Sequence, residues 1–406
     1  MEMQSIQYNM LGSRPQKLKL KQKFAAFLPV FTLILPSQLA LNTPWQMAFN
    51  VGVVLFILGG LLLPGVAAQR YGALLITLFT LLLVAAGIST VFNRWPRSLI
   101  VYGGLTLGYV SAIRAVGCVK DPAAFLRLLI LGICLTTLGI MIASLIVQPP
   151  RLRRYSGIFQ KSNAVGWFGS SVCSLLMGVF VYSRTRWRKK EFLFMLGVLV
   201  LGALFTIACN ARSALAGLGA AIGMFAIAFF HSFLMRSKVR RKRIVLGLSL
   251  IGFMLAFGYY FGFLDVLIEK FDRTTSAGDI SQGRFEMWSI HIKHWQWFGN
   301  GPRLISHYIS HNTYVDHLTK YGLLPLLLFV GFLSVLLLSG YYYTIKGTYQ
   351  AAPILLAVTS CFMAQAMFET GTSTPGIWIA IVVYSCLRYE IHNSSNQNRI
   401  PWNRVA

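Results

Sequence analysis

The residues best suited to chemistry lie in a polar stretch that directly precedes a long apolar run. Residues 309–322 read ISHNTYVDHLTKYG, and the chain continues as GLLPLLLFVGFLSVLLLSG. An imidazole can accept a proton near neutral pH, so His311 is a candidate general base. The alternative is that His311 is structural, as most single histidines are.

Two arginines are candidates for binding an anion. One lies between apolar runs, where a charge is costly, and the other lies in a polar loop. Arg212 lies in TIACNARSALAGLGAAIGMF, between two apolar runs. It is expected either to reach lipid headgroups or to bind an anion at the start of a helix, where backbone N–H groups add positive potential. Arg284 lies in DISQGRFEMW. Its guanidinium can hold a phosphate through two parallel hydrogen bonds, although an isolated loop arginine is often only a solvated charge.

A third basic group is Arg151, Arg153 and Arg154 in PPRLRRYSGIFQKSN. These residues are expected to contact the membrane surface or to line the mouth of a site for an anionic substrate, and the sequence favours neither. Metal binding is not expected. Five histidines gather within residues 265–320, but the segment has no HExxH motif and no paired Cys/His spacing.

Composition shows which structure must position these residues. The chain has 406 residues, of which 56% are hydrophobic and 12% charged, whereas soluble domains are about 25% charged. Apolar runs recur at the length that crosses a bilayer core of ~30 Å. The sequence therefore predicts an all-α, polytopic integral membrane protein with about twelve transmembrane helices. We expect these at residues 24–40, 46–66, 71–91, 98–118, 123–147, 163–183, 191–209, 213–234, 244–264, 321–345, 351–369 and 374–388.

The basic segments set the expected orientation. KLKLKQK, RTRWRKK and RSKVRRKR fall on one side of the predicted spans, which the positive-inside rule assigns to the cytoplasm together with both termini. The net charge of +26 is then explained by basic loops that face anionic lipid, rather than by binding to nucleic acid. Three regions follow: a nine-span region at 1–264, a long periplasmic loop at 265–320, and a three-span region with a cytoplasmic tail at 321–406. In the loop, FEMWSIHIKHWQWF has the mixed spacing of a short helix.

The ordered set of segments resembles one family. YSGIFQKSNAVG, CNARSALAG, SQGRFEMW, FGNGP and SHNTYVDHLTKYG, followed by an apolar span, are similar to segments of the O-antigen ligase and polysaccharide polymerase family. The resemblance covers residues 150–340 by motif. At Arg212 the match is looser, because Ala211 and Ser213 flank the arginine where the family often has Ser and Gly.

The resemblance implies a metal-independent, inverting glycosyltransferase of the C type in the bacterial inner membrane, with its active site on the periplasmic face and no cofactor. The donor would be an undecaprenyl-pyrophosphate-linked glycan, and the acceptor a hydroxyl of the lipid A core or of another lipid-linked glycan. His311, Arg284 and Arg212 would be catalytic. The expected substrate-binding residues are Arg151, Arg153, Arg154, Lys161, Asn163 and Asn312.

Three alternatives stay open. A repeat-unit polymerase of the same family would share these motifs. A solute transporter would suit twelve spans, with Glu369 as the one candidate for ion coupling. A scaffold without chemistry would tolerate substitution of Arg212, Arg284 and His311.

Overall fold

The computed structural model describes most of the chain between residues 57 and 397. The described residues are 57–63, 73–119, 121–148, 155–159, 161–183, 187–209, 211–235, 283–301, 310–369 and 375–397. The predicted spans 24–40 and 244–264 lie outside these residues, as does most of span 46–66.

The described residues form helices joined by short connections. The longer helices are α5 (Ala73–Asn93), α6 (Arg97–Val119), α7 (Pro122–Val147), α8 (Ser162–Ser183), α9 (Lys189–Ala208), α10 (Arg212–Met235), α15 (Leu323–Lys346), α16 (Ala351–Ala366) and α17 (Pro375–Gln397). Three short helices precede α15: α13 (Arg284–Lys293), α14 (Thr313–Asp316) and the π-helix η4 (His317–Tyr321).

Among the described residues, seven helices are long and apolar enough to cross a membrane: α5 to α10 and α15. Their mean hydropathies lie between 1.5 and 2.5. The predicted class, a helical protein embedded in a membrane, is supported by these seven helices. The full count of twelve spans stays a prediction. The expected span at 321–345 starts two residues later, because η4 extends to Tyr321, and the expected span at 351–369 is the shorter helix α16.

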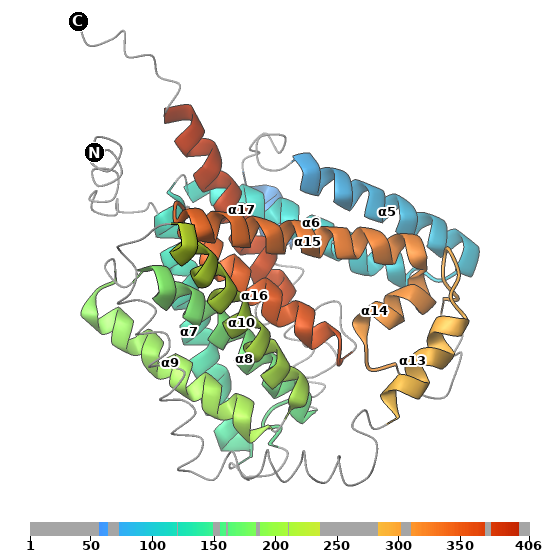
Figure 1. Ribbon diagram of the computed structural model, residues 1–406, viewed down its shortest axis with the longest axis horizontal. Coiled ribbons are helices and arrows are strands. Elements are labelled where there is room, and N and C mark those ends of the chain that lie inside the picture. The colour runs from blue at the N-terminus through green and yellow to red at the C-terminus, as the bar shows by residue number, and fades with distance from the viewer. Residues whose placement is uncertain are drawn as a thin grey trace, which may run out of the picture.

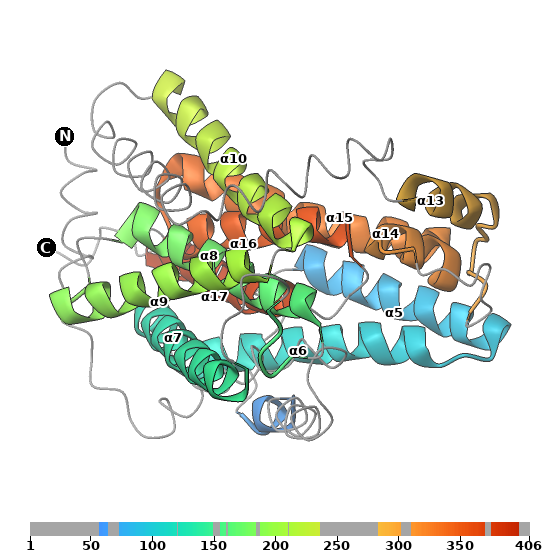
Figure 2. The same ribbon diagram turned by 90° about the horizontal axis from the view of Figure 1, so that it is seen from below.

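Helix α16 lies in the middle of the molecule, in contact with α8, α10, α15 and α17 (Figures 1 and 2). Almost every residue from Ala351 to Phe362 is buried. On one side of α16 lies the group α7 to α10, and on the other lie α5, α6 and α15. Because α16 is covered on all sides by protein, the surrounding helices hold the residues at its ends in position.

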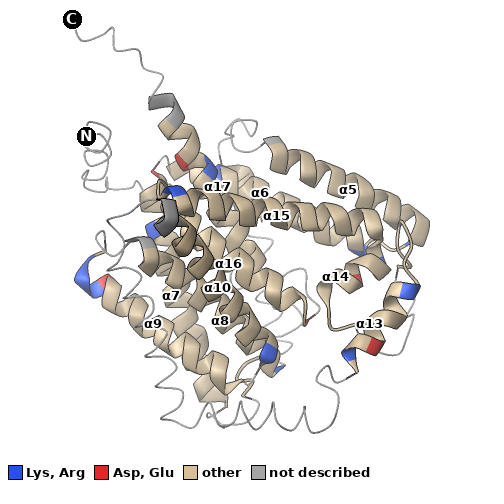
Figure 3. Ribbon diagram, viewed as in Figure 1, with Lys and Arg blue, Asp and Glu red and all other residues tan. Residues whose placement is uncertain are grey.

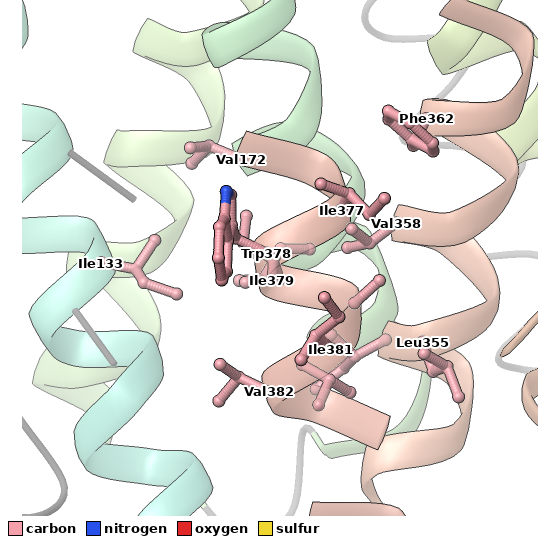
Figure 4. Packing of buried hydrophobic residues seen from close by; sticks show 14 of the residues in the cluster. Ile133, Val172, Leu355, Val358, Phe362, Ile377, Trp378, Ile379, Ile381 and Val382 are labelled. Carbon is pink, nitrogen blue, oxygen red and sulfur yellow. The ribbon is translucent and has the colours of Figure 1, made fainter. Parts of the chain in front are cut away.

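Small residues let these helices approach closely. A Cβ added at Gly178 of α8 would lie 2.5 Å from the Cα of Ile354 in α16. A Cβ at Gly108 of α6 would lie 2.0 Å from the ring of Trp378 in α17. Figure 4 shows this tryptophan among aliphatic side chains such as Val172 of α8. The helix crossings are therefore fixed by backbone-to-side-chain contact.

The chain before α15 is the part of the described structure that least resembles a simple bundle. The predicted short helix is confirmed as α13, which starts at Arg284. The π-helix η4 then leads into α15 through Gly322, whose φ is +111°. A π-helix is rare and often marks a functional site. These elements place the residues singled out in the sequence at one end of the bundle.

Candidate functional site

A buried carboxylate at the end of α16 is the centre of the candidate site. Glu369 is only 8% exposed. Its Oε1 accepts a hydrogen bond from Nδ2 of Asn163 at 2.5 Å and a longer one from Oγ of Ser213 at 3.5 Å. Its backbone oxygen accepts a hydrogen bond from Oγ1 of Thr313 at 2.7 Å. One residue thus connects the starts of three helices, α8, α10 and α14.

His311 faces this carboxylate. Its Nδ1 lies 3.8 Å from Oε2 of Glu369, and its side chain is 41% exposed. With Nδ1 turned toward the carboxylate, Nε2 at the opposite side of the ring is left to take a proton from a substrate. The carboxylate can orient the ring and stabilise the imidazolium that such a transfer would form.

The backbone of His311 is held in an unfavourable conformation. Its φ is +49°, a left-handed value that costs a non-glycine residue of order 1–3 kcal/mol. Both neighbours are buried and fixed: Oγ of Ser310 donates to Oδ1 of Asp316 at 2.7 Å, and Oδ1 of Asn312 accepts from the N–H of Tyr314 at 2.9 Å. The two anchored neighbours hold the backbone of His311 in this conformation despite the strain.

Arg284 reaches the same end of α16 from outside the bundle. Its Nη1 donates a hydrogen bond to the backbone oxygen of Phe368 at 3.1 Å. Gly283 precedes it with φ +77°, a conformation that glycine adopts without a steric cost and that lets the chain turn into α13 at this point. The helix is joined to the histidine segment through Nε1 of Trp288, which donates to the backbone oxygen of Ser310 at 2.7 Å.

Arg212 is the first residue of α10, as the sequence predicted. Its neighbour Ser213 touches Glu369 and also accepts a hydrogen bond from Nε1 of Trp167 at 3.2 Å. Arg212 and Arg284 both lie beside Glu369: Arg212 precedes Ser213, which contacts the carboxylate, and Arg284 donates to the backbone oxygen of Phe368, the residue before Glu369. The structure thus brings together Arg212, Arg284 and His311, which are separated by 72 and 27 positions (284 − 212 and 311 − 284).

The surroundings favour an anion. Helices α8, α10 and α13 all begin at this end of the molecule, and the N-terminal end of a helix carries unpaired N–H groups and a positive partial charge. Figure 3 shows basic residues at the lower ends of α10 and α13. Two arginines and three helix starts lie beside the carboxylates of Glu369 and of Glu286 in the first turn of α13, so the guanidinium groups and the unpaired N–H groups are what could bind an anion here.

The predicted substrate-binding residues have different surroundings. Asn163 donates its amide to Glu369, and Asn312 is buried with its side-chain oxygen capping α14. Lys161 is exposed one residue before α8. Arg151, Arg153 and Arg154 lie outside the described residues. Substrate binding by all six residues stays a prediction.

His317, in the same motif as His311, has a structural position. Its ring stacks on Phe329 at 4.5 Å, and its Nδ1 lies 2.7 Å from the backbone oxygen of Thr313. Burial lowers the pKa of His317 to about 4, against a smaller raising effect of the Thr313 hydrogen bond. Within the part of the chain that is described, no three His, Cys, Asp or Glu side chains form a group able to hold a metal ion.

Sequence reasoning missed the central role of Glu369. It was considered only for ion coupling in a transporter. The available signal was its position as a lone acid at the end of an apolar run. Its partners come from α8, α10 and α14, and no local pattern could connect them.

Comparison with other proteins identifies no relative: no family model matches the sequence, and no curated protein does either.

Proposed function

We propose that the protein is a glycosyltransferase that moves a glycan from an undecaprenyl-pyrophosphate carrier to an acceptor hydroxyl. The observation that carries the proposal is the cluster of Arg212, Arg284, His311 and Glu369 at one end of a set of membrane-spanning helices. A lipid diphosphate brings its charge to the membrane boundary, which is where arginines at helix starts can bind it.

The groups present suit a displacement at the anomeric carbon. The acceptor oxygen forms a bond to that carbon while the bond from the carbon to the pyrophosphate oxygen breaks. His311 takes the acceptor proton, and Glu369 stabilises the resulting imidazolium. The negative charge that develops on the departing diphosphate is met by Arg212 and Arg284. Attack opposite the leaving group inverts the anomeric centre.

The arginine pair replaces the charge that a divalent metal would supply. Guanidinium groups are permanently charged and bind phosphate oxygens in pairs of hydrogen bonds. Here both arginines lie beside the Glu369 carboxylate, and an anion bound by both guanidinium groups would balance their positive charge. Donors that are positioned before the reaction stabilise the transition state most effectively.

The membrane arrangement belongs to the same proposal. We place the chain in the bacterial inner membrane with about twelve spans, its termini in the cytoplasm and the cluster on the periplasmic face. We propose the lipid A core as the acceptor, which would make the protein an O-antigen ligase; another lipid-linked glycan as acceptor would make it a repeat-unit polymerase. The C-type, metal-independent mechanism is part of this proposal.

The test compares two histidines of the same segment. Purified protein in liposomes is given an undecaprenyl-pyrophosphate glycan and an acceptor, and released undecaprenyl pyrophosphate is measured. The variant is His311→Asn, because asparagine tolerates the left-handed backbone but cannot act as a base at neutral pH. We expect release to fall 10²–10⁴-fold. The exposed His294, replaced by Ala, is the control and leaves the rate unchanged. Full activity of His311→Asn would remove the mechanism.

The products separate the ligase from the polymerase. In cells that lack the gene, lipopolysaccharide gels should show complete loss of O-antigen capping. Loss of long chains with one repeat still attached would instead identify a repeat-unit polymerase.

A further inference from the structure

A second candidate binding site lies at the far end of α13 from Arg284. A cavity of about 760 Å³ opens between the C-terminal end of α5 and the chain that follows α13. Its walls include Phe92 and Asn93 from α5, and Trp295, Gln296 and Trp297 from the later segment. Sites for small molecules commonly have volumes of this size, apolar walls and a few polar groups.

The segment that forms one wall is tied to α5. The backbone oxygen of Phe298 accepts hydrogen bonds from Nδ2 of Asn93 and Oγ of Ser89, both at 2.8 Å. The ring of Phe298 stacks on Phe92, with centroids 4.9 Å apart and planes 5° from parallel. Residues from distant parts of the sequence therefore hold this wall in place.

The same segment is pressed against η4 from the other side. The N–H of Asn300 donates to the backbone oxygen of Thr319 at 2.7 Å. A Cβ added at Gly299, whose φ is +75°, would lie 2.4 Å from the backbone oxygen of Lys320. The cavity is thus formed before any ligand arrives, because its backbone is fixed on two sides.

The side chains on this rigid backbone face outward. Trp295 and Trp297 are 42% and 60% exposed, and their rings meet edge to face with centroids 5.6 Å apart. Gln296 between them is exposed, so its side-chain amide is accessible to a ligand. Exposed aromatic rings on a fixed backbone mark a contact surface.

We propose that this cavity binds a sugar ring of the acceptor glycan. The apolar C–H face of a pyranose packs on indole rings, and amides such as Gln296 both donate to and accept from sugar hydroxyls. Exposed Arg94 at the rim suits an acidic substituent of the glycan. A concave wall that mixes aromatic rings with amides fits a sugar better than the acyl chains that an interfacial tryptophan meets.

The position of the cavity suits an acceptor. Helix α13 has 10 residues, so it is about 15 Å long. Arg284 stands at one end of it and the cavity lies beyond the other. An oligosaccharide held in the cavity can span that length and present its terminal hydroxyl to His311. This assignment of the sugar to the acceptor rests on the proposed function, whereas binding itself does not.

The test measures binding without turnover. Purified full-length protein in lipid nanodiscs is titrated with the delipidated core oligosaccharide of the host cell, and binding is followed by saturation-transfer NMR and calorimetry. Trp297→Ala and Gln296→Ala should each weaken binding about tenfold. The matched control is Phe285→Ala, which removes an aromatic ring of similar exposure at the other end of α13. His311→Asn should bind the oligosaccharide as the wild type does.

Each result has a definite meaning. If Trp297→Ala binds the oligosaccharide as tightly as the wild type, the proposal that the cavity binds a sugar is overturned. The absence of any oligosaccharide binding overturns it as well. Quenching of Trp297 by brominated lipids, with glycan binding unchanged on its removal, would assign the aromatic rings to membrane contact and also overturns the proposal. Glycan binding with an active His311→Asn variant would contradict the proposed function but keep the cavity.

Discussion

The middle of α16 and the residues at its C-terminal end differ in burial, polarity and backbone strain. In the middle, residues such as Leu355 and Val358 are fully buried among apolar side chains, and glycines of α8 and α15 touch the α16 backbone. At the end, Glu369 gathers polar groups from three other segments. His311 beside it is strained and partly exposed. The first region is packed apolar core, and the second contains strain and charge, as the proposed chemistry requires.

The comparison teaches that the two kinds of substitution should have separable effects. Changes in the middle of α16 act on packing and should remove folded protein. Changes at its end remove charges or a base from a preformed site and should spare the fold. The predictions below test this separation, from the largest expected effect to the smallest.

The largest effect is expected at Gly178 in α8. A leucine there would drive its Cβ to 2.5 Å from the Cα of Ile354, which is backbone and cannot rotate away. We expect Gly178→Leu to yield no stably folded protein, as judged by detergent gel filtration. Gly197→Ala in α9 is the control, since no atom lies within 4 Å of its added Cβ, and it should be neutral or stabilising by up to about 1 kcal/mol. Normal folding of Gly178→Leu would contradict the packing described.

A strong effect on activity alone is expected at Arg284. Removing one preorganised charge donor typically costs about 10²–10³ in rate, so Arg284→Ala should lose that much glycan transfer with normal yield and melting temperature. Lys293→Ala, at the other end of α13 and exposed, is the control. Arg284→Lys should recover only part of the rate, because lysine cannot donate in pairs. A fully active Arg284→Ala variant would show that Arg284 does not stabilise the departing diphosphate.

An intermediate effect on stability is expected from His317 as the pH falls. Burial lowers its folded pKa to about 4, so between pH 6.5 and 4 the unfolded chain binds a proton that the folded chain does not. The neutral ring therefore contributes fully to the free energy of unfolding above pH 6.5. This contribution, up to roughly 3 kcal/mol, is lost as the pH falls toward 4. The melting temperatures at pH 7.5 and pH 4.5 should therefore differ less for His317→Phe than for the wild type. Exposed His294→Phe serves as the control and should keep the wild-type difference.

The smallest of these effects is expected at Glu369. Glu369→Gln keeps the size of the side chain and its contact with Asn163, but it removes the charge that faces His311. We expect kcat to fall roughly 10- to 100-fold, with a changed pH profile, because the imidazolium loses its counter-ion. Exposed Glu286→Gln on α13 is the control. An unchanged pH profile would show that Glu369 has only a structural role.

The sequence singled out Arg212, Arg284 and His311, which the structure brings to one end of the bundle, but it did not predict the contacts that assemble them. The chemistry of these residues stays a prediction. Arg212 was singled out because a charge between two apolar runs is unusual, and Arg284 because a guanidinium in a loop can hold a phosphate through two hydrogen bonds. Both are the first residues of helices. The cap formed by Asn312 follows a known preference of asparagine and was readable in HNTYVD. The role of Glu369 was not, since its partners Asn163 and Ser213 meet it only after α8, α10 and α16 pack together. The strain at His311 likewise arises from tertiary anchoring.

The central claim is that Arg212 and Arg284 together bind a diphosphate on a lipid carrier. The most direct measurement is the melting temperature of purified protein with and without undecaprenyl pyrophosphate. A ligand at 100 times its dissociation constant adds about 2.7 kcal/mol to stability, so the wild type and His311→Asn should both melt at a higher temperature. The double variant Arg212→Ala with Arg284→Ala should show no shift. Equal stabilisation of that double variant would contradict the account.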